Sequence, residues 1–243
     1  MIEQLKRLRL TGMLETLQMR LEQSHESNMP YHEFFHLVLQ DEIQRRDVVN
    51  LAKRLQRAHF EESKDFQGLH LEHYHAKTQK LIRSLQNNMY LKSSQHIILM
   101  GPTGTGKTHL AQALGNLACR HGYTVRFIRA NAFLREMQAS RADNTWEQKL
   151  KKFLSPDLLI LDDFGLKTLT SQESDDMYEL IADRANKGSF IITSNRTVDA
   201  WLKLFPDPVM ANAALDRLAN NAHQIILEGE SFRKKNRPQQ DNS

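Results

Sequence analysis

One octapeptide combines glycines, a lysine and a threonine at the spacing that phosphate binding requires. It matches the pattern G-x-x-x-x-G-K-[ST] in full and consists of Gly101-Pro102-Thr103-Gly104-Thr105-Gly106-Lys107-Thr108. Glycines let the backbone curl until consecutive N–H groups point into one concave site. Lys107 is expected to reach the β- and γ-phosphates of ATP, and the Thr108 hydroxyl to ligate Mg²⁺. All eight residues are therefore candidate nucleotide contacts; a glycine-rich turn without a ligand is the plain alternative.

Two adjacent acids follow an apolar run further along the chain. The segment consists of Leu158-Leu159-Ile160-Leu161-Asp162-Asp163. A strand of this kind delivers carboxylates to the edge of a sheet, where Asp162 is expected to hold Mg²⁺ through its water shell. Asp163 is expected to polarise the attacking water as a general base. The second acid favours a hydrolytic motor over a small-molecule kinase, which more often activates a substrate hydroxyl elsewhere.

Three further polar residues are candidates for the same reaction. Asn195 follows a predicted strand and is expected to orient the lytic water, although Ser-Asn is also common turn chemistry. Arg217 is the candidate for a cation that a neighbouring subunit supplies to the γ-phosphoryl oxygens; the alternative is a surface arginine paired with Asp216. Arg233 is a second candidate cation, a phosphate sensor after the last predicted strand.

A parallel sheet would bring these motifs together. From residue 96 onward, short apolar runs alternate with helical patterns, and this series predicts a parallel sheet covered by helices on both faces. The expected strands are 97–100, 124–128, 158–161, 190–193 and 224–227. Gly122 is expected to end a helix over 107–121, and Thr170 with Glu173 to form a capping box. Asn131 and Asn144 are expected to cap two shorter helices.

The N-terminal part has a different texture. Residues 1–60 show helical apolar spacing with interleaved basic residues, which acidic residues nearly match in number. Contact with DNA or a partner and a solvated helix face both fit this pattern. We expect an all-helical domain over 1–66, an ATPase domain over 67–232, and a polar, disordered tail over 233–243.

A histidine-rich stretch follows the helical part. His70, His73 and His75 lie close to Glu72 in the sequence, within the polar segment 61–95. Metal ligation needs a fixed geometry and a fourth ligand, and the sequence indicates neither. We interpret the stretch as a connector with a helix around 74–87.

Composition narrows the class of protein. The chain has 243 residues, a formal net charge of +4 and a sequence pI of about 9.1, a weak indication of a polyanionic partner. Its single cysteine, Cys119, excludes an intrachain disulfide and fits a reducing compartment. No apolar run approaches the roughly 18 residues of a membrane span, and the first residues lack signal-peptide features. We therefore expect a cytoplasmic protein.

The motifs together resemble the IstB-like family of AAA+ ATPases, a sister group of the DnaC helicase loaders and the DnaA-like initiators. The resemblance covers nearly the whole chain. Its most specific pieces are Gly101-Pro102-Thr103-Gly104-Thr105-Gly106-Lys107-Thr108-His109-Leu110-Ala111, Leu159-Ile160-Leu161-Asp162-Asp163-Phe164-Gly165 and Ile191-Ile192-Thr193-Ser194-Asn195-Arg196. Two N-terminal pieces separate IstB from DnaC, namely Leu5-Lys6-Arg7-Leu8-Arg9-Leu10-Thr11-Gly12-Met13 and Phe35-His36-Leu37-Val38-Leu39-Gln40-Asp41-Glu42.

This resemblance implies an α/β fold with a P-loop AAA+ core and a five-stranded parallel sheet. It also implies an ATP-dependent, double-stranded-DNA-binding homo-oligomer that assists a separate, cognate transposase. Lys107, Thr108, Asp162, Asp163, Asn195 and Arg217 carry over with the roles given above, and Arg233 matches the C-terminal sensor of the clade. Because 26 residues follow Arg217, no helical lid domain is expected.

Two other functions stay open beside the transposition helper. A DnaC-like helicase loader would share the ATPase core, and a small-molecule kinase would share the P-loop. The DNA-contacting face is equally open, since each basic candidate also suits a solvated surface. These candidates are Arg126, Arg129, Arg135, Arg141 and the cluster Lys149-Leu150-Lys151-Lys152.

Overall fold

The computed structural model describes residues 1–62, 64–185 and 187–229. The chain divides into two compact units, Met1–Arg54 and a second that begins at Leu55. The first unit is helical, as expected. The domain boundary that we expect after residue 66 remains a prediction, because compactness does not test whether either part folds alone.

The first unit contains α1 (Ile2–Arg7), α2 (Thr11–Ser27) and most of α3 (Tyr31–Ala58). The N-cap residue of α2 is Leu10, whose side chain makes no hydrogen bond to the first N–H groups of the helix. Instead, the buried Glu42 of α3 accepts bonds from the backbone N–H groups of Gly12 at 2.7 Å and Met13 at 3.2 Å. Gly12 permits this approach, since a Cβ there would lie 2.7 Å from the Asp41 carbonyl oxygen. The α2–α3 pair is therefore joined by a cap from one helix to the other.

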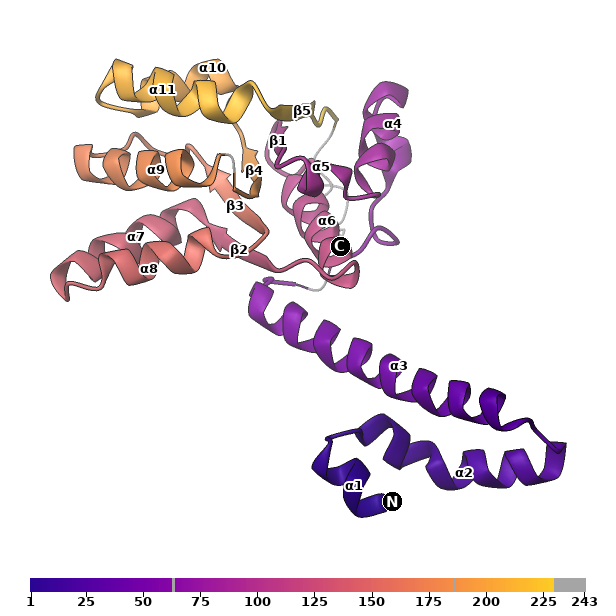
Figure 1. Cartoon of the computed structure of the whole chain (residues 1–243). Coiled ribbons are helices and arrows are strands. Elements are labelled where there is room, and N and C mark those ends of the chain that lie inside the picture. The colour runs from indigo at the N-terminus through magenta and orange to yellow at the C-terminus, as the bar shows by residue number, and fades with distance from the viewer. Residues whose placement is uncertain (63, 186, 230–243) are drawn as a thin grey trace, which may run out of the picture. The chain divides into compact units, whose positions relative to one another are not determined.

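The second unit is built around a sheet (Figure 1). Its described elements, after the end of α3, are η1 (Leu71–His73), α4 (Ala76–Leu85), α5 (Met89–Lys92), β1 (His96–Met100), α6 (Lys107–Arg120), β2 (Val125–Arg129), α7 (Ala130–Ala142), α8 (Trp146–Leu154), β3 (Leu158–Phe164), α9 (Ser171–Arg184), β4 (Ser189–Ser194), α10 (Val198–Trp201), η2 (Leu202–Leu204), α11 (Pro208–Ala219) and β5 (Ala222–Ile226).

Five strands of the described chain form one parallel sheet in the order β2-β3-β4-β1-β5. The chain passes from β1 to β2 through α6 and then returns across the sheet to β3, β4 and β5. Because such crossovers are right-handed, α6 lies on one face and the helices of the return path lie on the other. That other face is covered by α7, α8, α9 and α11, on the left of Figure 1. The predicted fold class, a parallel sheet between helices, is thus confirmed.

Side-chain alternation decides which face each strand residue serves. Ile98, Leu159 and Ile192 belong to the core under α7, α8, α9 and α11. The residues between them face α6: a Cβ on Gly115 of α6 would lie 2.6 Å from the Ile160 side chain. The three inner strands β1, β3 and β4 are buried on both faces, which explains their continuous apolar runs.

Helix ends test the predicted caps. Thr170 and Glu173 form the capping box at α9, and Gly122 follows the C-cap of α6 with a φ of 96°, so both predictions are confirmed. The predictions for two asparagines are wrong. Asn131 lies inside α7, whose N-cap is Arg129, and Asn144 precedes the N-cap of α8 in a left-handed conformation. Asparagine suits both a cap and a left-handed turn, and Asn144 takes the turn, whereas α7 begins one residue before Asn131.

His96 opens β1 in full burial. Its Nδ1 accepts a bond from the Phe190 backbone N–H at 3.2 Å, and no described group bonds its Nε2. Burial, aided by the nearby Arg184 guanidinium, lowers the pKa of His96 from 6.5 to about 4. The folded protein therefore holds this imidazole neutral where the unfolded chain would protonate it.

This shift predicts acid sensitivity of the fold. Because the unfolded chain binds the proton more readily, the free energy of unfolding should fall as pH drops from 6.5 towards 4, by about 3 kcal/mol at most. Urea unfolding of the parent and of His96→Asn across this range checks it. The variant should lose the His96 part of the slope; parallel curves for the two proteins would contradict the assignment.

Among the described residues, no helix combines the length and the apolar character that crossing a membrane takes.

Candidate nucleotide-binding site

The phosphate loop joins β1 to α6, as the sequence predicts. Gly101 has a φ of 144°, and a Cβ there would lie 2.2 Å from the Leu227 carbonyl oxygen, so only glycine fits. Gly106 is the N-cap of α6 with a φ of 88°. The N-terminus of α6, with the partial positive charge of the helix dipole, consequently opens towards the loop.

Two side chains hold the loop in shape. The Nζ of Lys107, a buried residue, donates to the carbonyl oxygens of Gly101 at 2.8 Å and Pro102 at 2.7 Å. From outside the loop, the Tyr74 hydroxyl donates to the Thr105 carbonyl oxygen at 2.8 Å. Burial raises the pKa of Tyr74 to about 12, which keeps this donor protonated. The Lys107 ammonium therefore lies inside the phosphate loop, and Tyr74 stabilises the loop from outside.

Asp162 on β3 faces the start of α6. Its Oδ1 accepts bonds from the Thr108 hydroxyl at 2.9 Å and from the Thr193 hydroxyl at 2.6 Å. Burial raises the pKa of Asp162, and the two hydroxyl bonds act in the opposite direction. A hydroxyl and a carboxylate at this distance are the hard oxygen donors that Mg²⁺ prefers. The residues present thus fit the magnesium site that the sequence predicts.

Asp163 owes its place to an irregularity of β3. The register with β4 shifts between Leu161, which pairs with Ile192, and Phe164, which pairs with Ser194. Asp163 lies at this bulge in the left-handed region, with a φ of 54°, and its N–H donates to the Thr193 hydroxyl at 2.9 Å. Consecutive residues of a regular strand point to opposite faces, whereas a bulge re-aims them. Both acids therefore line the same cavity.

The other predicted residues lie at different places. The Asn195 amide donates to the Thr103 hydroxyl at 3.3 Å, so the structure brings it to the phosphate loop. Arg217 on α11 bonds the Ala213 carbonyl oxygen at 2.8 Å and covers the Tyr178 ring at 5.6 Å. It is not among the described residues that line the cavity. Arg233 lies outside the described residues.

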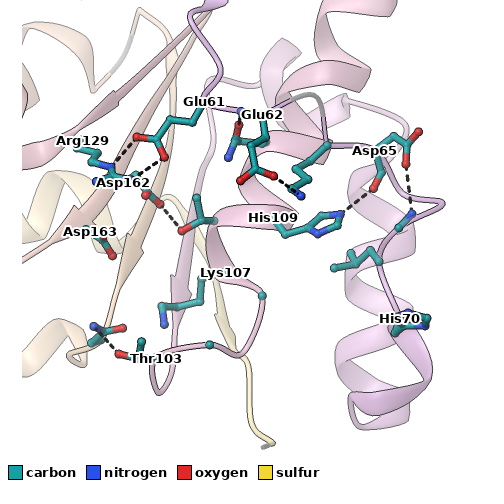
Figure 2. A pocket seen from close by; sticks show the side chains of 18 of the residues that line it. Glu61, Glu62, Asp65, His70, Thr103, Lys107, His109, Arg129, Asp162 and Asp163 are labelled. Atoms are coloured by element: carbon teal, nitrogen blue, oxygen red, sulfur yellow. Dashed lines mark hydrogen bonds and ion pairs between the residues drawn. The ribbon is translucent and has the colours of Figure 1, made fainter. Parts of the chain in front are cut away.

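A cavity of about 1120 Å³ joins these groups (Figure 2). One wall is formed by the phosphate loop and the two acids, and another by the segment between α3 and η1. The sequence indicates only a connector in this segment and does not predict that the segment forms a wall of the site. Its lining residues include Glu61, Glu62, Asp65, Leu69 and His70. The segment is fixed by contacts with α6: the Glu62 N–H donates to the Gln112 side chain at 3.2 Å, and His109 contacts the Asp65 carbonyl oxygen at 3.0 Å.

The histidine-rich turn brings three possible ligands together. Ligand atoms of His70, Glu72 and His73 lie within 4.8 Å of one another, and all three side chains are exposed. His75 instead contacts Glu228 at 3.2 Å. A structural zinc site is enclosed and has a fourth protein ligand, whereas these three ligands are exposed and no fourth joins them among the described residues.

Several of the basic candidates for DNA contact have partners within the fold, and two of them lie over aromatic rings. Arg141 bonds the buried Asp176 at 2.5 Å and covers the Trp146 ring at 5.0 Å. The Arg126 guanidinium covers the Phe153 ring at 5.9 Å. These contacts give both arginines a structural role.

Comparison with known proteins agrees with this site. The family model described as "IstB-like ATP binding protein" matches residues 3–240. A Mycobacterium tuberculosis protein described as an ATP-binding protein in an insertion sequence is 40% identical over 235 residues, which cover 96% of this chain and 94% of the relative. The ATP-binding protein described for insertion sequence IS21 of Pseudomonas aeruginosa is 31% identical, with coverage of 95% and 87%.

Solved structures share the fold at lower identity. The replication initiator DnaA, solved with AMPPCP and single-stranded DNA, matches with a TM-score of 0.60 and 21% identity, over 71% of this chain and 52% of that chain. The DnaC helicase loader matches with a TM-score of 0.56 and 21% identity, over 65% of this chain and 96% of that chain. At this identity the likeness concerns the fold alone.

The family model spans nearly the whole chain, and the relatives above exceed 30% identity along most of it. Both agree with a phosphate loop, a hydroxyl and a carboxylate gathered at one edge of the sheet. The chain therefore belongs to the family of IstB-like ATP-binding proteins, and it is a P-loop ATPase with the AAA+ fold.

Proposed function

We propose that this protein is a helper of an insertion-sequence transposase, which binds double-stranded DNA and hydrolyses ATP within a homo-oligomer to regulate target capture. The hydrolytic part is carried by the contact of the Thr108 hydroxyl with the Asp162 carboxylate, 2.9 Å apart at the mouth of the phosphate loop. The transposition part is supported by family membership, since the relatives are described as proteins of insertion sequences.

In this proposal the loop and Lys107 bind the β- and γ-phosphates, and Thr108 with Asp162 would hold Mg²⁺, which would offset charge on the phosphate oxygens. Asp163 accepts a proton from the attacking water while the water oxygen forms a bond to the γ-phosphorus. The bond from that phosphorus to the bridging oxygen breaks, and ADP and phosphate leave. Thr193 positions both acids, because its hydroxyl donates to Asp162 and accepts from the Asp163 N–H.

Two further residues are proposed to take part in the reaction. Asn195 is 3.3 Å from Thr103 and is proposed to orient the lytic water from the end of β4. Arg217 is proposed to act on the nucleotide of a neighbouring subunit, since its side chain lies over Tyr178 rather than along its own cavity. Arg233 keeps its proposed role as a sensor. The helical part, residues 1–66, is proposed to contact DNA or the transposase.

The test measures phosphate release by the full chain with and without duplex DNA, together with gel-shift binding in ATP, in ADP and without nucleotide. We expect DNA binding that requires ATP and weakens steeply as salt rises, because phosphate contacts release counterions. A protein that hydrolyses ATP but ignores DNA in every nucleotide state, and stays monomeric, would end the proposal of a DNA-acting oligomer.

The partner is tested separately. Addition of the transposase encoded beside this chain should change ATP turnover on DNA, whereas addition of the host replicative helicase should not. A response to the helicase alone would favour the helicase-loader alternative, which has only the shared fold in its support.

A further inference from the structure

The segment that follows α3 places a carboxylate on an arginine of the nucleotide cavity. The Arg129 Nε lies 2.6 Å from Glu61 Oε1, and its Nη2 donates to Glu61 Oε2 at 2.7 Å. This is a two-point contact across 68 residues of sequence, and both side chains line the cavity that contains the phosphate loop (Figure 2). Neither residue has a part in the reaction described above.

Arg129 stands at the metal-binding edge of the sheet. It is the last residue of β2 and pairs in register with Asp162 on β3, so the two side chains leave the sheet on the same face. That face is the one on which Thr108 reaches Asp162. An extended arginine side chain at this position can therefore approach the outer phosphate of a bound triphosphate.

The present partner of Arg129 is weakly held. The Arg129 side chain is 57% exposed and that of Glu61 is 38% exposed, and ion pairs in such surroundings contribute little to stability. A triphosphate offers the same guanidinium several anionic oxygens, which arginine binds in the same two-point manner. The free-energy cost of replacing Glu61 by a phosphate as the partner of the Arg129 guanidinium is therefore small.

Glu61 itself is kept in place by its neighbours. Phe60 fits against Gly115 of α6, where a Cβ would lie 2.9 Å from the Phe60 ring. On the other side, the Glu62 N–H bonds Gln112 of the same helix. The carboxylate thus stays at the cavity when the guanidinium leaves it.

We infer that Arg129 is a further nucleotide-binding residue, which contacts the terminal phosphate of ATP, and that Glu61 competes for it and so sets the affinity for ATP. The inference rests on the proposed function, since it concerns the same site. It makes the segment after α3 a determinant of ATP affinity and of the discrimination between ATP and ADP.

The test uses fluorescent ATP and ADP analogues, titrated with Mg²⁺ into the full-length protein. Glu61→Gln keeps the shape of the side chain and removes its charge, which should free Arg129 and tighten ATP binding by about fivefold, with a smaller change for ADP. Arg129→Gln should weaken ATP binding several-fold. The double variant should bind ATP as Arg129→Gln does, because Glu61 acts through Arg129.

Glu62→Gln is the matched control. It removes the same charge one residue away, from a side chain that lines the same cavity and pairs with Lys64. General relief of repulsion would tighten ATP binding equally in Glu61→Gln and Glu62→Gln, and would persist in the Arg129→Gln background. Either result overturns the inference, as does unchanged affinity in Glu61→Gln. A parent protein that binds neither analogue would instead refute the proposed function.

Discussion

The Lys107→Ala protein should fold normally and lose its affinity for ATP and ADP by at least about a hundredfold, since truncation of a charge that pairs inside a desolvated site typically costs several kcal/mol. The buried ammonium lies within 2.8 Å of two loop carbonyl oxygens, where the phosphates are expected. Its loss removes the point charge that the backbone N–H groups cannot replace. Equilibrium titration with a fluorescent nucleotide measures the effect, and the thermal melt reports the fold.

Lys64→Ala is the control for this experiment. Lys64 lines the same cavity and pairs with Glu62, so its removal changes the charge of the cavity by the same amount. It should reduce nucleotide affinity far less. Equal losses in the two variants would mean that Lys107 acts only through net charge, and the assignment of a phosphate-binding lysine would fail.

The Arg217→Ala protein should bind ATP with the parent affinity and hydrolyse it about a thousandfold more slowly or worse, the range found when a trans-acting arginine is removed. The side chain lies over Tyr178 and outside its own cavity, so its removal leaves the nucleotide contacts of its own subunit intact. Steady-state phosphate release and nucleotide titration separate the two effects. Lys203→Ala, an exposed lysine on the nearby η2, should behave like the parent.

Mixing gives this second prediction a sharper form. Lys107→Ala and Arg217→Ala subunits are each expected to be inactive alone, but a mixed oligomer would contain intact phosphate loops beside subunits with an intact Arg217. A trans-acting arginine therefore predicts that hydrolysis returns when the two variants are combined. An inactive mixture that still assembles would argue for action within one subunit, and parent-like turnover by Arg217→Ala alone would remove the residue from the reaction.

The fold and part of the site could be predicted because their signals are local. An apolar run, a glycine-rich turn and a helical period each lie within about ten residues, and the crossover rule then orders the strands. The phosphate loop lies in one such segment, and the adjacent acids Asp162 and Asp163 lie in another. Their approach followed from the sheet, since the carboxyl ends of parallel strands meet at one edge.

Contacts between distant segments could not be predicted in this way. Thr193 was part of a quoted motif, yet its bonds to Asp162 and Asp163 depend on the register of two strands. Tyr74 and Glu61 lie in a polar stretch whose pattern indicates only a connector, and each reaches a residue more than 30 positions away. Polar side chains have no periodic signal that reveals such partners.

The bulge in β3 sets regularity against reactivity. A strand with one residue fewer between Leu161 and Phe164 would pair evenly with β4, and it would relieve the left-handed conformation of Asp163. Selection of this protein for heat resistance alone would thus tend to remove the bulge and yield a more stable protein that no longer hydrolyses ATP. Any engineering of the scaffold has to screen for turnover as well as for melting temperature.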